Sequence, residues 1–215
     1  MRGAIFPWRD DNRFNLLIDG PAFFPRMIAA IDGAQQQVEL ELYLVEAGAC
    51  AEAVVQALVD AARRGVIVRC LFDDFGSLAF TSSLRTRLTE AGVILRFYNR
   101  VHWRRGIRNF YRDHRKLLLV DKALAVVGGT GVTDEFWRPD QDTSEWHEVM
   151  VEIRGPLVLD WQALFDRQFH ANPRRRAWRP AENFGLPRLP KAPVSGSGFG
   201  RVAYADSRQH RDILQ

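Results

Sequence analysis

The strongest constraint on the fold is a helical pattern that runs directly into a strand pattern in the first third of the chain. Residues 51–65, AEAVVQALVDAARRG, place apolar side chains at helical spacing and end in two arginines and a glycine, which favour a helix terminus. Residues 66–74, VIVRCLFDD, follow at once and are typical of a buried strand. A helix that returns so directly into a buried strand indicates a strand-helix-strand unit with parallel strands.

The same alternation continues on both sides of this unit. Strand patterns occur at 13–19, 38–45, 93–98 and 147–153, and helical patterns occur at 22–34, 84–92 and 155–170. Alternating strands and helices, with strands rich in β-branched residues, are typical of sheets that are covered by helices. The sequence therefore predicts an α/β fold with a mixed, mostly parallel β-sheet flanked by helices on both faces.

Composition divides the chain into three parts. Residues 1–171 contain the alternating patterns, and residues 172–200 are a basic segment rich in Pro, Gly and Ser, which predicts a linker. Residues 201–215 begin a new strand and turn, so we interpret them as the start of a truncated second unit. The net charge is +4, but residues 172–191 alone carry six Lys/Arg and one Glu. Such local basic patches suit phosphate-bearing partners, either anionic lipid surfaces or nucleic acid.

Several classes of protein are disfavoured by what the sequence lacks. No run of about 20 apolar residues is present to span a bilayer, and the N-terminal residues have no signal-peptide pattern. Cys50 and Cys70 are the two cysteines, and we expect both to be buried free thiols in a reducing compartment. A structural zinc site is not expected from so few cysteines.

The stretch RDHRKLLLVDKALAVVGG, residues 112–129, combines an apolar hairpin with reactive side chains. Residues two apart on a strand share a face, so His114 and Lys116 project together, with Leu118 and Val120 continuing that face. Asp121 and Lys122 form a plausible two-residue turn, after which the partner strand returns. A polar pair at a strand entrance is commonly only a solvated edge, and this alternative stays open on spacing alone.

Phosphoryl chemistry gives the pair a function. A neutral imidazole such as that of His114 is a nucleophile for phosphorus and an acid or base near neutral pH. The Lys116 ammonium is a positive charge that can hold phosphoryl oxygens in the transition state. Gly128 and Gly129 allow close backbone approach to a phosphate, and Thr130 adds a hydroxyl.

The stretch HRKLLLVDKALAVVGG resembles the HKD motif of the phospholipase D superfamily, His-x-Lys-x4-Asp followed by two glycines. Similarity to the bacterial cardiolipin synthases of that superfamily extends to NLLIDGPAFFPRMIAAI, VELELYL, AARRGVIVRCLFDDFGS and IRGPLVLDWQALFDRQF. It covers nearly all of the chain up to residue 171 and continues at SRQHRDIL, which resembles the opening of the second half of such enzymes. The resemblance implies a phospholipase D-like catalytic half with one HKD motif.

The resemblance also implies roles for individual residues. His114 is expected to be the phosphohistidine nucleophile or the acid that protonates the leaving group, and Lys116 is expected to bind the phosphoryl oxygens. Asp121 belongs to the motif, but we interpret it as a brace of the hairpin turn with at most an indirect effect on catalysis. The carboxylate that orients the histidine is expected near SEWHEVMVEI, where Glu148 is the first candidate and Glu145 the second.

Two further positions concern phosphate binding. Gly129 and Thr130 are expected to contact the substrate phosphate together with the lysine of the motif. Gly131 stands where the family usually has Asn, which removes an amide that could contact the substrate. No metal or organic cofactor is implied, because histidine and lysine supply the charge.

The leading functional hypothesis is a phosphatidyltransferase of the cardiolipin synthase type that forms a phosphohistidine and passes the phosphatidyl group to an alcohol. A phospholipase D or a nuclease would use the same residues with water as the acceptor. A third hypothesis follows because no other H-x-K occurs: the residues two positions after the later histidines are Val149, Asn172 and Asp212. The chain then requires a second HKD half, from the same gene or from a homodimer, or it is an inactive half or a binding module.

The residues that precede and enter the motif indicate what kind of molecule the protein binds. Residues 100–116 hold seven Lys/Arg and one Asp, interleaved with Trp103, Phe110 and Tyr111. This composition suits anionic phospholipid headgroups with aromatic side chains at the interface, or equally a nucleic-acid backbone. The family resemblance ranks lipid first, so we expect a cytoplasmic protein that is peripheral to the inner membrane of a bacterium.

Overall fold

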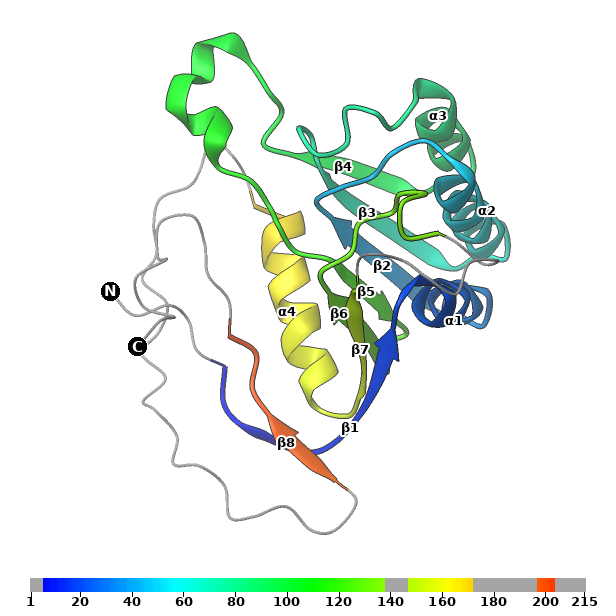
Figure 1. The fold of residues 1–215 in the computed structure, drawn as a ribbon, viewed down its shortest axis with the longest axis vertical. Coiled ribbons are helices and arrows are strands. Elements are labelled where there is room, and N and C mark those ends of the chain that lie inside the picture. Colours follow the sequence, from blue (N-terminus) through cyan, green and yellow to red (C-terminus); the bar gives the residue numbers. More distant parts are fainter. Residues whose placement is uncertain (1–5, 138–146, 172–196, 204–215) are drawn as a thin grey trace.

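One mixed sheet organises the chain (Figure 1). The computed structural model describes residues 6–137, 147–171 and 197–203. Within these residues, eight strands lie in the order β4-β3-β2-β5-β6-β7-β1-β8. The strands are β1 (Arg9–Ile18), β2 (Gln37–Leu42), β3 (Ile67–Asp73), β4 (Ile94–Tyr98), β5 (Leu117–Val120), β6 (Leu124–Gly128), β7 (Val149–Arg154) and β8 (Gly198–Gly200). The helices are α1 (Gly20–Asp32), α2 (Ala49–Arg63), α3 (Ser82–Glu90) and α4 (Leu157–Phe169), with a 3-10 segment η1 (Trp103–Phe110).

The predicted α/β fold with a mixed sheet is confirmed, but the balance of strand directions differs from the prediction. Among the described strands, only β4, β3 and β2 are parallel, and these three strands are joined through α2 and α3. The pairs β2/β5, β5/β6, β6/β7, β7/β1 and β1/β8 are all antiparallel. The expectation of a mostly parallel sheet is therefore wrong. The reason is that β5 and β6 are joined by a short turn, which can link only antiparallel strands.

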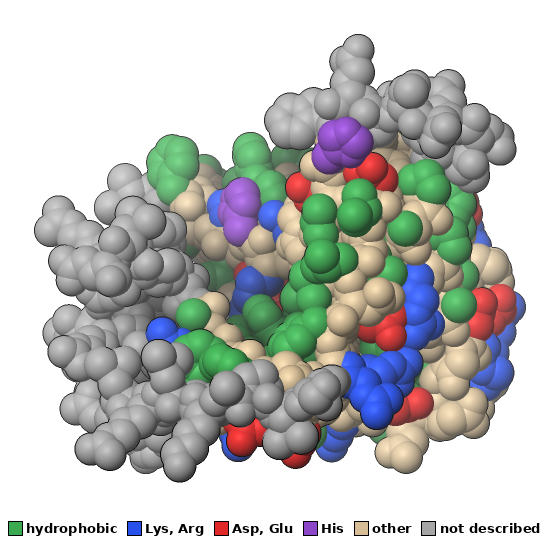
Figure 2. All heavy atoms as spheres, turned by 60° about the horizontal axis from the view of Figure 1, so that its bottom comes forward, with side chains coloured by type: hydrophobic (Ala, Val, Ile, Leu, Met, Phe, Trp, Pro, Cys, Tyr) green, Lys and Arg blue, Asp and Glu red, His purple; other side chains and the backbone are tan. Residues whose placement is uncertain are grey.

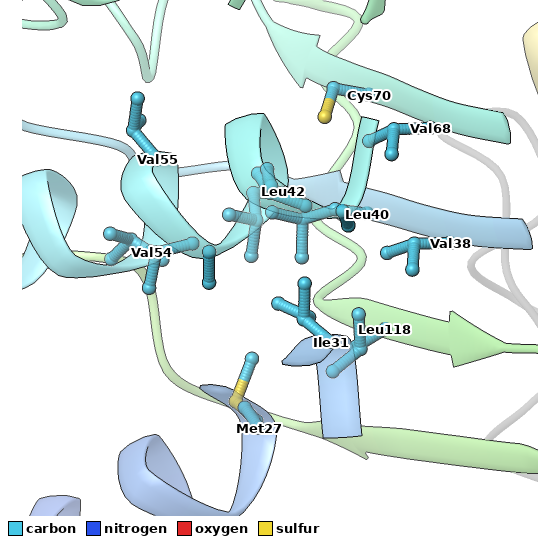
Figure 3. Close-up of a cluster of buried hydrophobic side chains, with 14 of the residues drawn as sticks. Met27, Ile31, Val38, Leu40, Leu42, Val54, Val55, Val68, Cys70 and Leu118 are labelled. Carbon is cyan, nitrogen blue, oxygen red and sulfur yellow. The ribbon is translucent and has the colours of Figure 1, made fainter. Parts of the chain in front are cut away.

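Helices cover both faces of the sheet, as predicted. On one face, α1, α2 and α3 pack over a large apolar core (Figure 1). Figure 3 shows how β2 and β5 contribute Val38, Leu40 and Leu118 to this core, opposite Met27 and Ile31 of α1 and Val54 and Val55 of α2. Cys50 and Cys70 lie in the same core as buried free thiols, and burial raises the pKa of both. The prediction that both cysteines are buried free thiols is therefore confirmed.

The opposite face is covered by α4. Leu117 and Leu119 of β5 pack with Val158 and Phe165 of α4 in a second apolar cluster. Leu118 and Val120 belong instead to the first core. This division confirms the predicted alternation of β5, and it places His114 and Lys116 in register with the face that carries α1 and α2.

A segment expected to be linker joins the sheet. Residues 198–200, the last three of the predicted linker, form β8 and pair with β1 through Gly198 opposite Asn12. Val202, placed in the predicted second unit, is buried in the α4 cluster. The linker prediction over 172–196, the basic cluster at 174–178 and the predicted second unit beyond residue 203 lie outside the described residues.

The turn of the central hairpin is longer than predicted. Val120 pairs with Leu124, so three residues rather than two connect β5 and β6. Asp121 and Lys122 both adopt positive φ, 51° and 52°. The Asp121 carboxylate accepts hydrogen bonds from the backbone N–H groups of residues 35, 36 and 37, at 2.8 to 2.9 Å. Burial alone would raise the pKa of Asp121, but these three donors outweigh it and lower the pKa.

We predict that Asp121→Ala lowers the free energy of unfolding by about 2 kcal/mol, because three backbone donors lose a charged acceptor. The contribution of the wild-type carboxylate should be present above the pKa of an unfolded Asp and disappear as the pH falls through the lowered folded value. Urea unfolding at several pH values measures both effects, with Lys122→Ala as the neighbouring control. Equal stability of the two variants would contradict the bracing role.

Candidate active site

The proposed catalytic residues meet at one edge of the sheet. Neighbouring strands β2, β5, β6 and β7 run antiparallel, so the end of β2, the start of β5, the end of β6 and the start of β7 lie side by side. Tyr43 follows β2, Lys116 precedes β5, Gly129 follows β6 and Glu148 precedes β7. The fold thus brings together His114, Lys116, Gly129 and Glu148 from segments far apart in the sequence.

The imidazole of His114 is exposed at this edge and stacks on an aromatic ring. Its centroid lies 3.9 Å from that of Tyr43, with 19° between the ring planes. Partial burial, followed by the charge of Lys116, lowers the pKa of His114, although Asp73 and Asp113 oppose the shift. The ring is therefore neutral at pH 7 and has a nitrogen lone pair available to a substrate.

Lys116 is half-buried beside the same ring. Its Nζ atom lies 5.6 Å from the centroid of Tyr43, within the range of a cation–π contact. Burial lowers the pKa of Lys116, while the nearby charges of Glu148 and Asp113 act in the opposite direction. A lysine that is partly desolvated, with its aliphatic stem fixed, is a well-defined positive charge for an anionic substrate.

Glu148 lies behind the glycine pair. A Cβ atom at Gly129 would collide with the Glu148 carboxylate, so any side chain there would displace that carboxylate. The backbone of Glu148 is fixed by Asp19, whose N–H donates to the Glu148 carbonyl at 2.8 Å and whose carboxylate accepts the Glu148 N–H at 3.0 Å. Among the described residues, the buried Oε2 of Glu148 has no hydrogen-bond donor. It is an open acceptor beside Lys116, whereas Glu145 lies outside the described residues.

The remaining predicted phosphate contacts are placed differently. The Thr130 hydroxyl is buried and donates to the Gly131 carbonyl at 3.0 Å, so it is already engaged. A Cβ atom at Gly131 would come within 2.7 Å of both the Cβ atom and the carbonyl oxygen of Leu44. The backbone here therefore has no room for the Asn that the family usually carries. Asp121 lies at the opposite end of β5 from His114, away from this edge.

Comparison with known proteins identifies the family of the chain. The family profile described as cardiolipin synthase, PLD-like domain, matches residues 27–171, about two thirds of the chain. The chain belongs to this family. Cardiolipin synthase B of Salmonella typhi is 31% identical over 211 residues, which cover 97% of this chain and 50% of that protein. Cardiolipin synthase A of Pseudomonas putida strain W619 is 33% identical over 165 residues, covering 76% of this chain and 34% of that protein.

The chain thus spans half or less of the length of these two cardiolipin synthases. Two solved structures share its fold: Nuc, a phospholipase D family member from Salmonella typhimurium, and NucT from Helicobacter pylori. The first has a TM-score of 0.55 and 18% identity, covering 74% of this chain and 94% of that chain. The second has a TM-score of 0.54 and 14% identity, covering 74% and 96%. The phospholipase D-like fold implied by the resemblance is confirmed.

The strand entrance that carries His114 in this PLD-like domain is held by a buried carboxylate. Asp73, at the end of β3, accepts the N–H of Asp113 at 3.0 Å and the Arg112 guanidinium at 3.2 Å. It also accepts the N–H groups of Phe75 and Gly76, at 3.0 and 3.2 Å. One fully buried carboxylate therefore fixes both the loop after β3 and the residues immediately before His114.

A second buried cluster lies on the far side of the strand, under α4. Arg115 ion-pairs with Glu41 at 2.7 Å and with Asp113 at 3.2 Å, and Gln168 of α4 donates to Asp113 at 3.1 Å. Burial and the neighbouring Asp113 charge raise the pKa of Glu41 well above its ordinary value. Burial opposes ionisation of Asp113 as well, but Arg115 and its hydrogen bonds lower the pKa of Asp113. Of the two carboxyl groups, Glu41 is therefore the one that is harder to ionise.

Sequence reasoning missed several of these residues. The strand pattern at 38–45 gives no role to Tyr43, Glu39 or Glu41, yet both glutamates are almost fully buried. The strand pattern at 147–153 gives no role to His147, but its Nδ1 lies 2.9 Å from an Asp19 carboxylate oxygen. The sequence does contain a signal for these buried residues, which is the pair of glutamates in a strand that is otherwise apolar. A carboxylate is costly to bury unless it is paired, so two glutamates in a buried strand indicate basic partners nearby.

Neither a metal centre nor a membrane span is found in the part of the chain that the structure describes. No group of three or more His, Cys, Asp or Glu side chains is arranged there to hold a metal ion. None of the helices in those residues combines the length and apolar character needed to cross a membrane.

We predict that Glu41→Gln keeps the fold at pH 7 and removes a pH-dependent loss of stability. A carboxyl with a raised folded pKa contributes stability below its unfolded pKa, and that contribution is lost as the pH rises through the folded value. Gln stays neutral at every pH, whereas Glu41→Leu, which leaves the buried Arg115 without this partner, should cost about 3 kcal/mol. Urea unfolding from below the pKa of an unfolded Glu upwards compares the three proteins, and parallel profiles for wild type and Glu41→Gln would refute a raised pKa of Glu41.

We also predict that Lys116→Gln raises the pKa of His114, because the ammonium is one of the causes of the lowered value. Histidine proton signals followed by NMR over pH 4 to 8 report the titration, and His114→Gln assigns the signal. Lys122→Gln, which removes the same charge at the far end of the hairpin, is the control. An unchanged His114 pKa in Lys116→Gln would show that the two side chains do not interact electrostatically.

Proposed function

We propose that this chain is the catalytic half of a phosphatidyltransferase of the cardiolipin synthase type, acting through a phosphohistidine on His114. The observation that carries the proposal is a neutral, exposed imidazole held by stacking on Tyr43 beside the Lys116 ammonium. A nucleophile for phosphorus must be unprotonated, accessible and close to a charge that stabilises the phosphoryl oxygens. This pair meets all three conditions.

In the first step, a His114 nitrogen attacks the phosphorus of an anionic phospholipid. A P–N bond forms while the P–O bond to the headgroup alcohol breaks, and the departing oxygen takes a proton from an acid. Lys116 lies beside the imidazole and neutralises the charge that builds on the non-bridging oxygens. The backbone at Gly129 approaches the phosphate without a side chain in the way.

In the second step, the hydroxyl oxygen of an acceptor alcohol attacks the phosphohistidine. The new P–O bond forms, the P–N bond breaks, and the acceptor proton returns to the group that served as the acid. A second HKD half, from the same gene or from another copy of the chain, would supply that group as its own histidine. The open Oε2 of Glu148 is suited to orienting an imidazole at the site, and this is the role we propose for it.

A sheet face beside the site offers a place for the second half. Phe14, Leu16 and Ile18 of β1 are 45% to 62% exposed, and Val149 of β7, paired with Ile18, is 43% exposed. Figure 2 shows a band of hydrophobic side chains across the described surface. Because Val149 adjoins Glu148, a partner covering this row would reach the catalytic edge. This apolar row supports a shared active site over an inactive, isolated binding module.

The acceptor separates transfer from hydrolysis. Water in place of the alcohol would make the protein a phospholipase D or a nuclease with the same covalent intermediate. We place the transferase first because of its family membership and expect it to act at the cytoplasmic surface of the inner bacterial membrane, without a metal or cofactor.

We predict that His114→Asn abolishes phosphoenzyme formation, while His170→Asn, the same change at an exposed position on the C-terminal end of α4, does not. The chain is incubated together with a second HKD half, from the same gene or from another copy of the chain, and with phosphatidylglycerol labelled at the phosphate. The reaction is quenched in alkali, and the protein is assayed for bound label. Labelled product is then separated into cardiolipin, phosphatidic acid and remaining substrate. Retention of the label by His114→Asn would overturn the proposed nucleophile, and phosphatidic acid as the sole product would identify a hydrolase.

A further inference from the structure

Five large apolar side chains stand exposed on two loops next to the catalytic edge. Phe75 and Leu78, in the loop between β3 and α3, are 53% and 66% exposed. Val101 is 45% exposed, Trp103 79% and Phe110 82%, in and before η1. We call these five residues the loop surface. Burying such side chains is favourable, so five exposed ones at one end of a small domain indicate a binding surface.

The two loops form one unit. The Val101 N–H donates to the Asp74 carboxylate at 2.9 Å, and the Asp74 N–H donates to the Tyr98 carbonyl at 3.1 Å. Arg112 lies over the ring of Phe75, with 5.6 Å from its Cζ to the ring centroid. The exposed apolar groups of both loops are therefore carried by a single hydrogen-bonded support. Figure 1 shows the η1 segment projecting beyond the sheet.

This unit is tied to the nucleophile. Asp73, which fixes the loop carrying Phe75, also holds the N–H of Asp113, the residue before His114. Asn99 donates to the Tyr111 carbonyl at 2.7 Å, which closes the base of the η1 segment just ahead of the same strand. A surface that binds through these loops thus has a defined position relative to His114.

The charge of the segment restricts what can cover it. Residues 100–108 contain four arginines and no acidic residue. Farther along, Arg112 and Arg115 are ion-paired with Asp73, Glu41 and Asp113 and are left out of this count. A partner with an apolar interior beneath a layer of negative charge suits both the exposed apolar side chains and this basic composition.

We propose that the loop surface inserts into the headgroup region of an anionic phospholipid bilayer and thereby presents lipid phosphates to His114. An interface of this kind seats aromatic side chains at the headgroup level and attracts arginines to anionic lipids. The inference rests on the proposed function for the reason that the bilayer is the substrate, but binding requires no catalysis. It identifies which side of the molecule faces the membrane.

The bilayer is favoured over single-stranded nucleic acid by the kind of apolar groups exposed. Aromatic rings stack on bases, so a nucleic-acid surface of this type is made of aromatic and basic residues. Leu78 and Val101 are aliphatic, offer no stacking face, and are as accessible as Phe75. Aliphatic and aromatic side chains together fit the acyl boundary of a membrane.

The test is flotation of the full chain with vesicles of phosphatidylglycerol and phosphatidylcholine, and with phosphatidylcholine alone. We expect binding to the anionic vesicles, and Trp103→Ser/Phe110→Ser should reduce the partition coefficient by roughly tenfold or more. The matched control is Ile67→Ser/Leu159→Ser, which removes two side chains that are 58% and 55% exposed outside the loop surface. It should bind as the wild type does.

Further arms keep the outcomes separate. His114→Asn should float as the wild type does, because binding does not need the nucleophile. A wild-type chain that floats but forms no phosphoenzyme would count against the proposed function alone. Trp103→Phe should retain binding and lose fluorescence quenching by lipids brominated on the acyl chains. Equal flotation of Trp103→Ser/Phe110→Ser and the control, or binding of a labelled single-stranded oligonucleotide with no binding to either vesicle, would overturn the membrane surface.

Discussion

The buried carboxylate of Asp73 is the interaction on which the catalytic edge depends. It ends β3, turns the chain into the following loop through two backbone N–H groups, and reaches across to Arg112 and the backbone of Asp113. A fully buried carboxylate is stable only if it is saturated with donors, so its four contacts require these segments to stay in place. Because one of them immediately precedes His114, the position of the nucleophile is set by the end of a parallel strand that is not its direct neighbour in the sheet.

The alternation of side chains along β5 places the proposed catalytic residues on one face of the strand and an ion-paired cluster on the other. His114 and Lys116 lie in register with Leu118 and Val120, over the core of α1 and α2, while Asp113 and Arg115 lie in register with Leu117 and Leu119, under α4. Polar residues thus occupy both faces at the strand entrance, reactive on one side and fully paired on the other. The helix α4 contributes Gln168 to that pairing, which gives it a role in the site although none of the proposed catalytic residues lies on it.

Strand periodicity and the motif predicted those features of the site that depend on residues close together in the sequence. The period of two placed His114 and Lys116 on one face, and family resemblance located Glu148 on the strand that does come to lie beside Lys116. Strand direction was not predictable in the same way, because a strand has the same pattern in either direction. The predicted hairpin is present, with a turn of three residues rather than two. Tyr43 and Asp73 were missed because their roles arise only where ends of strands distant in sequence meet. For Asp121 the motif suggests a catalytic role, but its contacts are structural. Its carboxylate accepts backbone N–H groups from the segment before β2 and so fixes the hairpin turn.

In the proposed mechanism, the environment of His114 suits one role and leaves another to a second group. Partial burial, followed by the charge of Lys116, lowers the pKa of His114, and a neutral imidazole favours nucleophilic attack but is a poor acid for the departing alcohol. One histidine in this environment is suited to one of the two proton states that the reaction requires. A second imidazole in a more acidic environment, beside the unpaired oxygen of Glu148, would remain protonated and complete the pair. In the proposed mechanism, a second half would be required because the environment that makes His114 suited to nucleophilic attack makes it unsuited to serve as the acid.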